Sequence, residues 1–349
     1  MERGPVYIAG LERSGTSLIY ALLASHPNLA MTRRTNLWTY FYNQYGDLSQ
    51  QDNFDRCLGM MMRYKRLVVL QPDFERIRRE FWRGEPTYAR LFALIHQHCA
   101  ERLGKQRWGD KSLNTERYVD QIFANFPTAK IIHMIRDPRD RYASSRARWR
   151  NMKGKVGAAT AMWLASMRWA VRNQQRYPDR YKIVRYEILV AEPEQTLRET
   201  CAFIGEDYAP TMVAMDGARK FRDAGGNSSY SRLQPGHIST GSIGRFRKVM
   251  SQREIAFMQV FAKRQMAACE YELDRIQLSL RDQLLLYFAE WPINLARLVA
   301  WRTREAIQNK VGRTVPARRM VAHAQHLDTN QDSGARVASG SRQNPKPRD

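Results

Sequence analysis

The chain begins with an apolar run, a polar loop with two glycines and a helical pattern in direct succession. Residues 5–9 (Pro-Val-Tyr-Ile-Ala) predict a buried strand. Residues 10–15 form the loop, and the apolar spacing of residues 16–25 predicts a helix that ends at His26-Pro27. Two later apolar runs, 129–135 and 182–186, are also followed by helical segments. Strands separated by helices favour an α/β fold with three layers, a parallel β-sheet flanked by helices.

The first loop has the outline of a phosphate-binding loop but lacks its lysine. In the nucleoside triphosphatase pattern, Gly-x-x-x-x-Gly-Lys-Ser/Thr, backbone N–H groups at a helix start hold phosphates and the lysine reaches the β- and γ-phosphates. Gly10, Gly15 and Ser17 occupy the matching places, whereas Thr16 replaces the lysine and Arg13 supplies a cation. The loop therefore predicts a P-loop nucleotide-binding-like fold and a phosphate site without a triphosphate–magnesium unit.

A second polar loop follows the apolar run 129–135. It begins Arg136-Asp137-Pro138, and the helical pattern after it puts Arg136 at the strand end and Ser144 two turns into the helix. An arginine fork and a serine hydroxyl can share a second phosphate. An Arg–Asp network around the turn is the alternative use of these residues.

Together these motifs resemble the sulfotransferase superfamily, in the branch with bacterial and protein-tyrosine sulfotransferases, over residues 5–270. Residues 13–17 are similar to its loop for the 5′-phosphosulfate of 3′-phosphoadenosine 5′-phosphosulfate, and Arg136 with Ser144 to its 3′-phosphate pair. The donor-binding residues that the resemblance implies are Arg13, Ser14, Gly15, Thr16, Ser17, Arg136, Ser144, Tyr186, Ser228 and Arg245. The resemblance implies an enzyme that moves a sulfuryl group from this donor to a hydroxyl or amine, without a metal.

Sulfuryl transfer resembles phosphoryl transfer, so catalysis is expected from positioning and from fixed cations near the leaving oxygen. Arg13 is the first candidate and Lys111, in a motif carried over from the family, is the second. Asp110 is the expected general base, with His26 as the alternative. Tyrosine-sulfating relatives have a glutamate pair after the His-Pro segment. The aligned residues 31–36 contain Arg33-Arg34 instead, which argues against tyrosine sulfation. These arginines could bind an anionic group of the acceptor.

The basic composition leaves other classes of protein to consider. The chain has 57 Lys plus Arg against 34 Asp plus Glu, a formal net charge of +23, which attracts anions of any kind. A nucleic-acid-binding protein is one alternative, but zinc ligands, a helix-turn-helix and an aromatic RNA motif are not recognisable, so no nucleic acid partner is expected. An ATP-dependent small-molecule kinase is the other, and it would need the lysine that Thr16 replaces. The Arg136–Ser144 pair argues against a catalytically inactive relative.

The sequence also predicts where the protein is located in the cell and how the chain divides into segments. The four cysteines lack metal-ligand spacing, and neither a secretory signal nor an apolar run of about 18 residues is recognisable, so a cytoplasmic location is expected. We expect a sulfotransferase domain over 1–275, a basic amphipathic helical segment over 276–312 and a disordered tail over 313–349. Residues 280–310 could lie on a membrane surface or pack on the core. The aromatic-rich residues 38–45 could stack on a sugar, although they also fit a core helix. Together with the basic amphipathic segment, they favour a carbohydrate or glycolipid acceptor.

Overall fold

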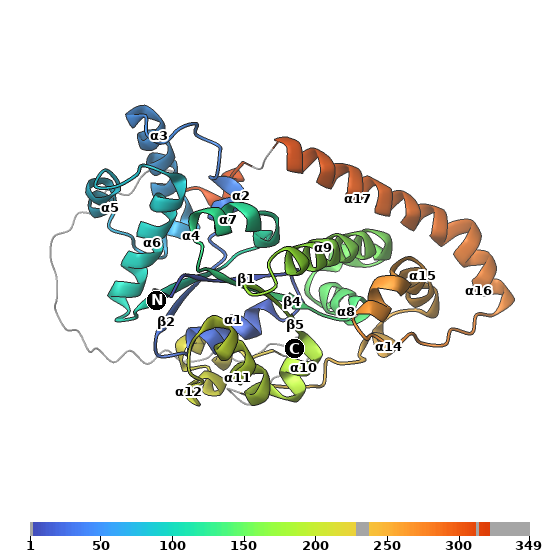
Figure 1. Cartoon of the computed structure of the whole chain (residues 1–349). Helices are drawn as coiled ribbons and strands as arrows, with labels where there is room; N and C mark the ends of the chain where they lie inside the picture. The colour runs from blue at the N-terminus through green and yellow to red at the C-terminus, as the bar shows by residue number, and fades with distance from the viewer. Residues whose placement is uncertain (1–2, 228–236, 312–313, 322–349) are drawn as a thin grey trace, which may run out of the picture.

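The computed structural model describes residues 3–227, 237–311 and 314–321. Its centre is an all-parallel sheet with helices on both faces (Figure 1). Five strands in the order β2-β3-β1-β4-β5 make up this sheet. Their bounds are Val6–Ala9 (β1), Leu29–Arg33 (β2), Arg107–Lys111 (β3), Lys130–Ile135 (β4) and Tyr181–Arg185 (β5). The three-layer parallel α/β fold predicted from the sequence is confirmed.

Strand β1 is buried on both faces, as its continuous apolar run predicts. Tyr7 and Ala9 belong to one hydrophobic cluster, and Val6 and Ile8 belong to the other. Alternate side chains of a strand point to opposite faces, so this strand contributes to both cores. Because every strand runs the same way, the carboxyl ends of β1, β3 and β4 meet at one edge, which is where α/β proteins bind ligands.

The helices divide between the two faces of the sheet. One face is covered by α1 (Thr16–Ala24), α10 (Tyr186–Ala191), α11 (Pro193–Ile204) and α12 (Thr211–Ala214), and the other by α6 (Tyr88–Arg102), α7 (Val119–Asn125) and α9 (Val156–Arg176) (Figure 1). The other helices are α2 (Leu37–Tyr40), α3 (Gln51–Met62), α4 (Lys65–Val68), α5 (Phe74–Phe81), α8 (Pro138–Arg148), α13 (Arg219–Asp223), α14 (Phe246–Val249), α15 (Gln252–Ala268), α16 (Leu280–Leu285) and α17 (Trp291–Val311).

Helices α16 and α17 form one almost continuous rod that packs against α9 and α15 (Figure 1). A π-helical turn, Leu286–Glu290, joins them. Pro292 has no N–H to donate to the carbonyl of Phe288, so the ordinary α-helical bond cannot form there and a wider turn is favoured. None of the described helices is both long and apolar enough to cross a membrane.

The first residues of the tail that we predicted to be disordered from 313 are instead attached to the body. Met320 forms an isolated antiparallel bridge with Tyr64, and the N–H of Val321 donates to the carbonyl of Arg63 at 2.8 Å. A short 3₁₀ turn, Ala317–Arg319, precedes them. The rest of the predicted tail, 322–349, lies outside the described residues.

Candidate functional site

The loop between β1 and α1 has a backbone that its glycines make possible. Gly10, Arg13 and Gly15 have φ values of 113°, 71° and 87°. A Cβ at Gly10 would lie 2.4 Å from the carbonyl oxygen of Met134, and one at Gly15 would lie 2.5 Å from the Tyr186 ring. The tight turn brings the loop to the amino end of the nine-residue helix α1. Free N–H groups at such an end favour an anion.

The structure brings Arg13, Arg136, Ser144 and Tyr186 together, as the sequence predicts for a donor site. The Nε of Arg13 donates to the Oγ of Ser144 at 2.9 Å. The Nη1 of Arg136 donates to the carbonyl of Arg13 at 3.2 Å, and its guanidinium stacks 4.3 Å from the Tyr186 ring centroid. These contacts hold the cationic groups beside the loop.

Residues 242–246, which precede and begin α14, contact the same site. The hydroxyl of Tyr186 lies 2.9 Å from the Oγ of Ser242, and the Nη2 of Arg136 donates to the carbonyl of Ser242 at 2.8 Å. Arg245 is half-buried and directly precedes α14. Asp140 of α8 anchors this region by accepting the N–H groups of Gly244 at 2.7 Å and Phe246 at 2.9 Å. The predicted donor contact Ser228 lies outside the described residues.

Arg141 is a cationic residue of this site that our sequence reasoning missed. Its side chain on α8 is only 2% exposed, and its Nε and Nη1 have no hydrogen-bond partner within the described part of the chain. Burial lowers the pKa of Arg141 to about 10, with Glu12 opposing the effect and the positive charges of Arg13 and Arg136 adding to it. A buried guanidinium without acceptors is costly unless an anion joins it. The signal was present, because Arg141 is three residues before Ser144 and so shares its helix face.

Lys111 ends β3 on the side of the phosphate loop. The residue is 6% exposed, and none of the described carboxylates lies within ion-pair distance of its ammonium. Burial lowers the pKa of Lys111 to about 8, with Arg34 adding to the effect and the nearby Glu12 opposing it. Lys111 is thus a second cation near the loop that has no ion-pair partner among the described residues, and its catalytic role stays a prediction.

Asp110, the predicted base, is enclosed on the other face of β3. The residue is fully buried and accepts hydrogen bonds from the Oγ1 atoms of Thr32 at 2.7 Å and Thr35 at 2.9 Å. Burial raises the pKa of Asp110, but the His96 ring, 3.8 Å away, and hydroxyl donors outweigh it, and the net pKa is lowered. This environment fits a carboxylate that stabilises the sheet, and its enclosure argues against contact with an acceptor.

His26 lies at the amino end of β2, the opposite edge of the sheet from the loop. Its Nδ1 accepts the N–H of Asn28 at 3.1 Å, and its Nε2 lies 2.8 Å from the carbonyl of Asp207. Both ring nitrogens are therefore engaged in local structure. The aromatic-rich residues 38–45 also have a core role, because Trp38 is 2% exposed and packs 5.4 Å from the rings of Tyr88 and Phe92.

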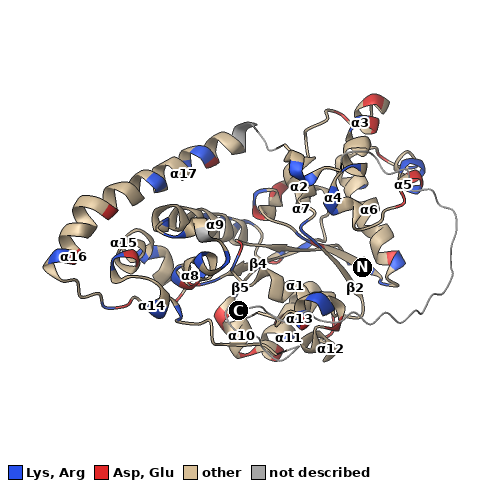
Figure 2. Cartoon of the chain, turned by 180° about the vertical axis from the view of Figure 1, so that it is seen from behind, with Lys and Arg blue, Asp and Glu red and all other residues tan. Residues whose placement is uncertain are grey.

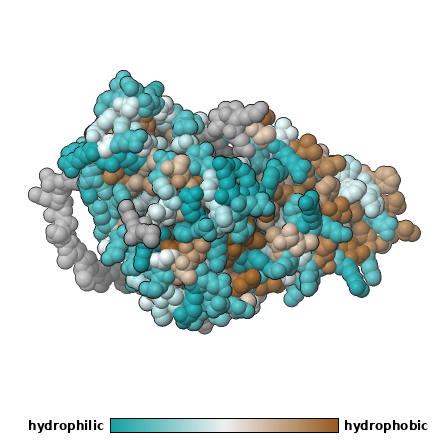
Figure 3. All heavy atoms as spheres, viewed as in Figure 1, coloured by the Kyte–Doolittle hydropathy of each residue, from teal (hydrophilic) through white to brown (hydrophobic). Residues whose placement is uncertain are grey.

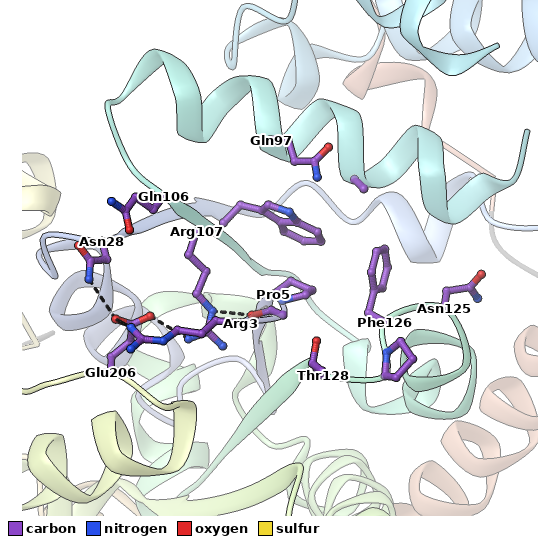
Figure 4. Close-up of a pocket in the computed structure, with 14 residues that line it drawn as sticks. Arg3, Pro5, Asn28, Gln97, Gln106, Arg107, Asn125, Phe126, Thr128 and Glu206 are labelled. Carbon is purple, nitrogen blue, oxygen red and sulfur yellow. Dashed lines mark hydrogen bonds and ion pairs between the residues drawn. The ribbon is translucent and has the colours of Figure 1, made fainter. Parts of the chain in front are cut away.

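Two cavities differ in their position relative to this site. One of about 600 Å³ lies at the amino ends of the strands, where Figure 4 shows Arg107 and Asn28 gathered around Glu206. That edge is remote from the phosphate loop. The second, of about 330 Å³, is bounded by the loop residues Gly10–Glu12, and by Trp169 of α9 and Trp301 of α17. Of these two cavities, the smaller one borders the phosphate loop.

Comparison with known proteins agrees with this geometry. Residues 5–210, more than half of the chain, match the sequence model of the Sulfotransferase family. Among solved structures, the sulfotransferase domain from the Synechococcus PCC 7002 olefin synthase has 21% identity and a TM-score of 0.54, covering 78% of this chain and 98% of that one. The sulfotransferase domain from the curacin biosynthetic pathway has 18% identity and a TM-score of 0.51, with 78% and 99% covered.

The two structural likenesses show the fold, and no curated protein sequence matches the chain. The matched region contains both polar loops, the strand end that carries Lys111 and the helix that carries Ser144. On the extent of that match, the chain belongs to the sulfotransferase family.

Proposed function

We propose that this sulfotransferase takes its sulfuryl group from 3′-phosphoadenosine 5′-phosphosulfate and transfers it to a hydroxyl or amine of a carbohydrate or glycolipid. The observation that carries the proposal is the cluster of Arg13, Arg136 and Arg141 at one loop, where Arg141 is buried and two of its nitrogen atoms have no acceptor among the described residues. Such a cluster suits a ligand with two separated anionic groups.

Each end of the donor has its own set of residues. The N–H groups of residues 14–17 and Arg13 would hold the 5′-phosphosulfate at the start of α1. Arg136, Ser144 and Arg141 would hold the 3′-phosphate, and the Tyr186 ring would border the nucleotide. The donor contacts predicted at Ser228 and Arg245 remain part of the proposal. The described residues contain no cluster of metal-ligating side chains, and the metal-free mechanism stays a prediction.

The proposed chemistry needs cations at the leaving oxygen. The acceptor atom forms a bond to sulfur while the bond between sulfur and the bridging oxygen breaks, leaving adenosine 3′,5′-bisphosphate. Arg13 and Lys111 would stabilise the negative charge that grows on that oxygen. Because Lys111 is held with a pKa of about 8, it is cationic over most of the physiological range. The acceptor's proton must go to a base.

We assign that base to Glu12 in preference to Asp110. Glu12 is exposed, belongs to the phosphate loop and borders the cavity of about 330 Å³. Its charge acts on both Lys111 and Arg141, which places it close to the cationic cluster. The half-buried Trp169 and Trp301 rings across the same cavity suit a sugar, whose apolar face stacks on aromatic side chains. Arg33 and Arg34 stay proposed contacts for an anionic acceptor group.

Thermal unfolding with two ligands tests the donor assignment. Adenosine 3′,5′-bisphosphate at about one hundred times its dissociation constant should add about 2.7 kcal/mol to the stability of the folded chain. ATP with magnesium should add much less, because ATP has no 3′-phosphate for Arg136 and Ser144 to bind. The reverse order of stabilisation would favour the kinase alternative. The cytoplasmic location stays a prediction.

A further inference from the structure

The rod formed by α16 and α17 exposes its apolar side to solvent. We call this surface the outer face, and its large residues are each between 40% and 80% exposed: Leu280, Leu284, Leu285, Tyr287, Phe288, Ile293, Leu295, Val299 and Ile307. Figure 3 shows hydrophobic atoms gathered over the end of the molecule where these helices lie. A surface helix of a globular protein normally turns its apolar side inward, so this arrangement indicates a partner.

Helical periodicity separates the outer face from the side that packs on the body. Asn294, Leu298 and Glu305 are buried and recur at spacings of four and seven residues, so they form one stripe. Ala296, Val299, Thr303 and Ile307, at spacings of three and four, form the opposite stripe and are exposed. The apolar stripe is thus held outward by the packing of α17 against α9.

Charges on the rod are sorted between the same two sides. All three acidic residues of 280–308 pair with arginines of the body, Asp282 and Glu290 with Arg253, and Glu305 with Arg117 at 2.5 Å. The arginines of the rod, in contrast, are exposed: Arg281, Arg297, Arg302 and Arg304. Figure 2 shows blue bands, the colour of Lys and Arg, along both α16 and α17. Arg297 and Arg304 still reach the body, since Arg297 donates to the carbonyl of Gly154 and Arg304 borders the cavity beside the phosphate loop. Arg281 and Arg302 remain as the cations of the solvent side, which has no unpaired carboxylate among residues 280–308.

We propose that the outer face docks on an anionic lipid bilayer, with the rod lying in the plane of the headgroups. Apolar side chains flanked by arginines match the acyl boundary and the anionic headgroups of such a surface. A second copy of the chain fits less well. Two outer faces laid against each other would bring the exposed arginines of both copies together with no exposed acid of the rod to pair with them.

Docking in this way has a consequence for the acceptor, which rests on the proposed function. The inner side of α17 supplies Trp301 and Arg304 to the cavity that also holds Glu12. A rod lying on the bilayer would hold that cavity next to the lipid surface. The acceptor would then be a membrane-resident molecule with a polar headgroup, reached without leaving the bilayer.

Vesicle binding by the full chain tests the docking without using the enzymatic reaction. Co-sedimentation is measured with vesicles of phosphatidylcholine alone and of phosphatidylcholine mixed with phosphatidylglycerol. Binding is expected to the mixed vesicles and to weaken as salt is raised. Val299→Glu should weaken it at least tenfold, and Arg302→Gln about fivefold on mixed vesicles only.

The matched control is Val69→Glu, because Val69 is 77% exposed but lies just after α4, at the other end of the molecule from α16 (Figure 1). This variant should bind vesicles as the unaltered chain does. Equal binding by Val299→Glu, or no binding of the unaltered chain to mixed vesicles at low salt, would overturn the proposal. If the unaltered chain forms a dimer that Val299→Glu dissociates, and does not bind vesicles, then the outer face docks on a second copy of the chain and not on lipid. Titration with adenosine 3′,5′-bisphosphate reports the donor site separately in every variant.

Discussion

Replacing Arg141 with methionine should make the ligand-free protein more stable and lower its affinity for the donor. The guanidinium is buried, and two of its nitrogen atoms lack partners in the part of the chain that the structure describes; burial and neighbouring positive charge lower its pKa to about 10. At 1.36 kcal/mol for each tenfold change in proton affinity, the cost to the folded state is about 3 kcal/mol. Methionine has a similar length and no charge, so it relieves this cost while filling most of the space.

The affinity for the donor should change in the opposite direction and become lower. A hydrogen bond between a charged pair is worth about 1.5–3 kcal/mol, so the variant should bind adenosine 3′,5′-bisphosphate roughly tenfold to a hundredfold more weakly. Chemical denaturation gives the first quantity and calorimetric titration the second. Arg148→Met, at the exposed carboxyl end of the same helix, is the control and should change neither.

An Arg141→Met variant that is less stable without ligand and binds the bisphosphate as tightly as the unaltered chain would refute the anion-binding role of Arg141. Loss of stability alone would mean that the guanidinium has a structural role. Unchanged affinity would mean that no phosphate reaches it. Both measurements together therefore separate an anion-binding arginine from a packing residue.

Three further predictions concern the reaction itself. Arg136→Lys should weaken bisphosphate binding at least tenfold, measured by calorimetry, because an ammonium cannot reproduce the planar fork. The kcat/KM for the donor should fall as pH rises through about 8, since Lys111 loses its charge there, and Lys111→Arg should move that fall to higher pH in the same rate profile. Glu12→Gln should lower kcat about 10²- to 10⁴-fold with the donor affinity unchanged, whereas Asp110→Asn should mainly lower the unfolding free energy in denaturation.

The parts of the site that the sequence predicted are those built on local patterns. The run 5–9 and the loop after it predicted β1, the phosphate loop and α1 because apolar residues, glycines and a helical period follow in order. Strands β2 and β3 did not stand out, because their carboxyl ends carry buried polar residues such as Thr32, Asp110 and Lys111. Such residues resemble a loop in the sequence and are tolerated in the sheet only through tertiary hydrogen bonds and charge.

Arg141 was missed for a related reason. A helix as charged as α8 normally faces solvent, but every residue from Pro138 to Ser145 is buried in this fold. Asp140 is buried because it accepts two backbone N–H groups, and Arg139 because it is paired with Asp137 at 2.7 Å. Whether a charged helix lies on the surface or under a loop depends on segment 237–250, which is about one hundred residues away in the chain. Periodicity within α8 cannot reveal that.

The rod of α16 and α17 connects two proposals that rest on different observations. It lies beyond residues 5–210, the region that matches the family, and none of the proposed donor contacts belongs to it. Its inner side nevertheless supplies a wall of the cavity beside the phosphate loop, and its outer side is apolar and cationic. An element outside the common region that forms part of the acceptor cavity is positioned to determine which acceptor enters.

If the outer face docks on lipid as proposed, acceptor choice and membrane attachment depend on the same helix. Substitutions that abolish vesicle binding from the outer side would then reduce turnover of lipid-borne acceptors while leaving water-soluble ones unaffected.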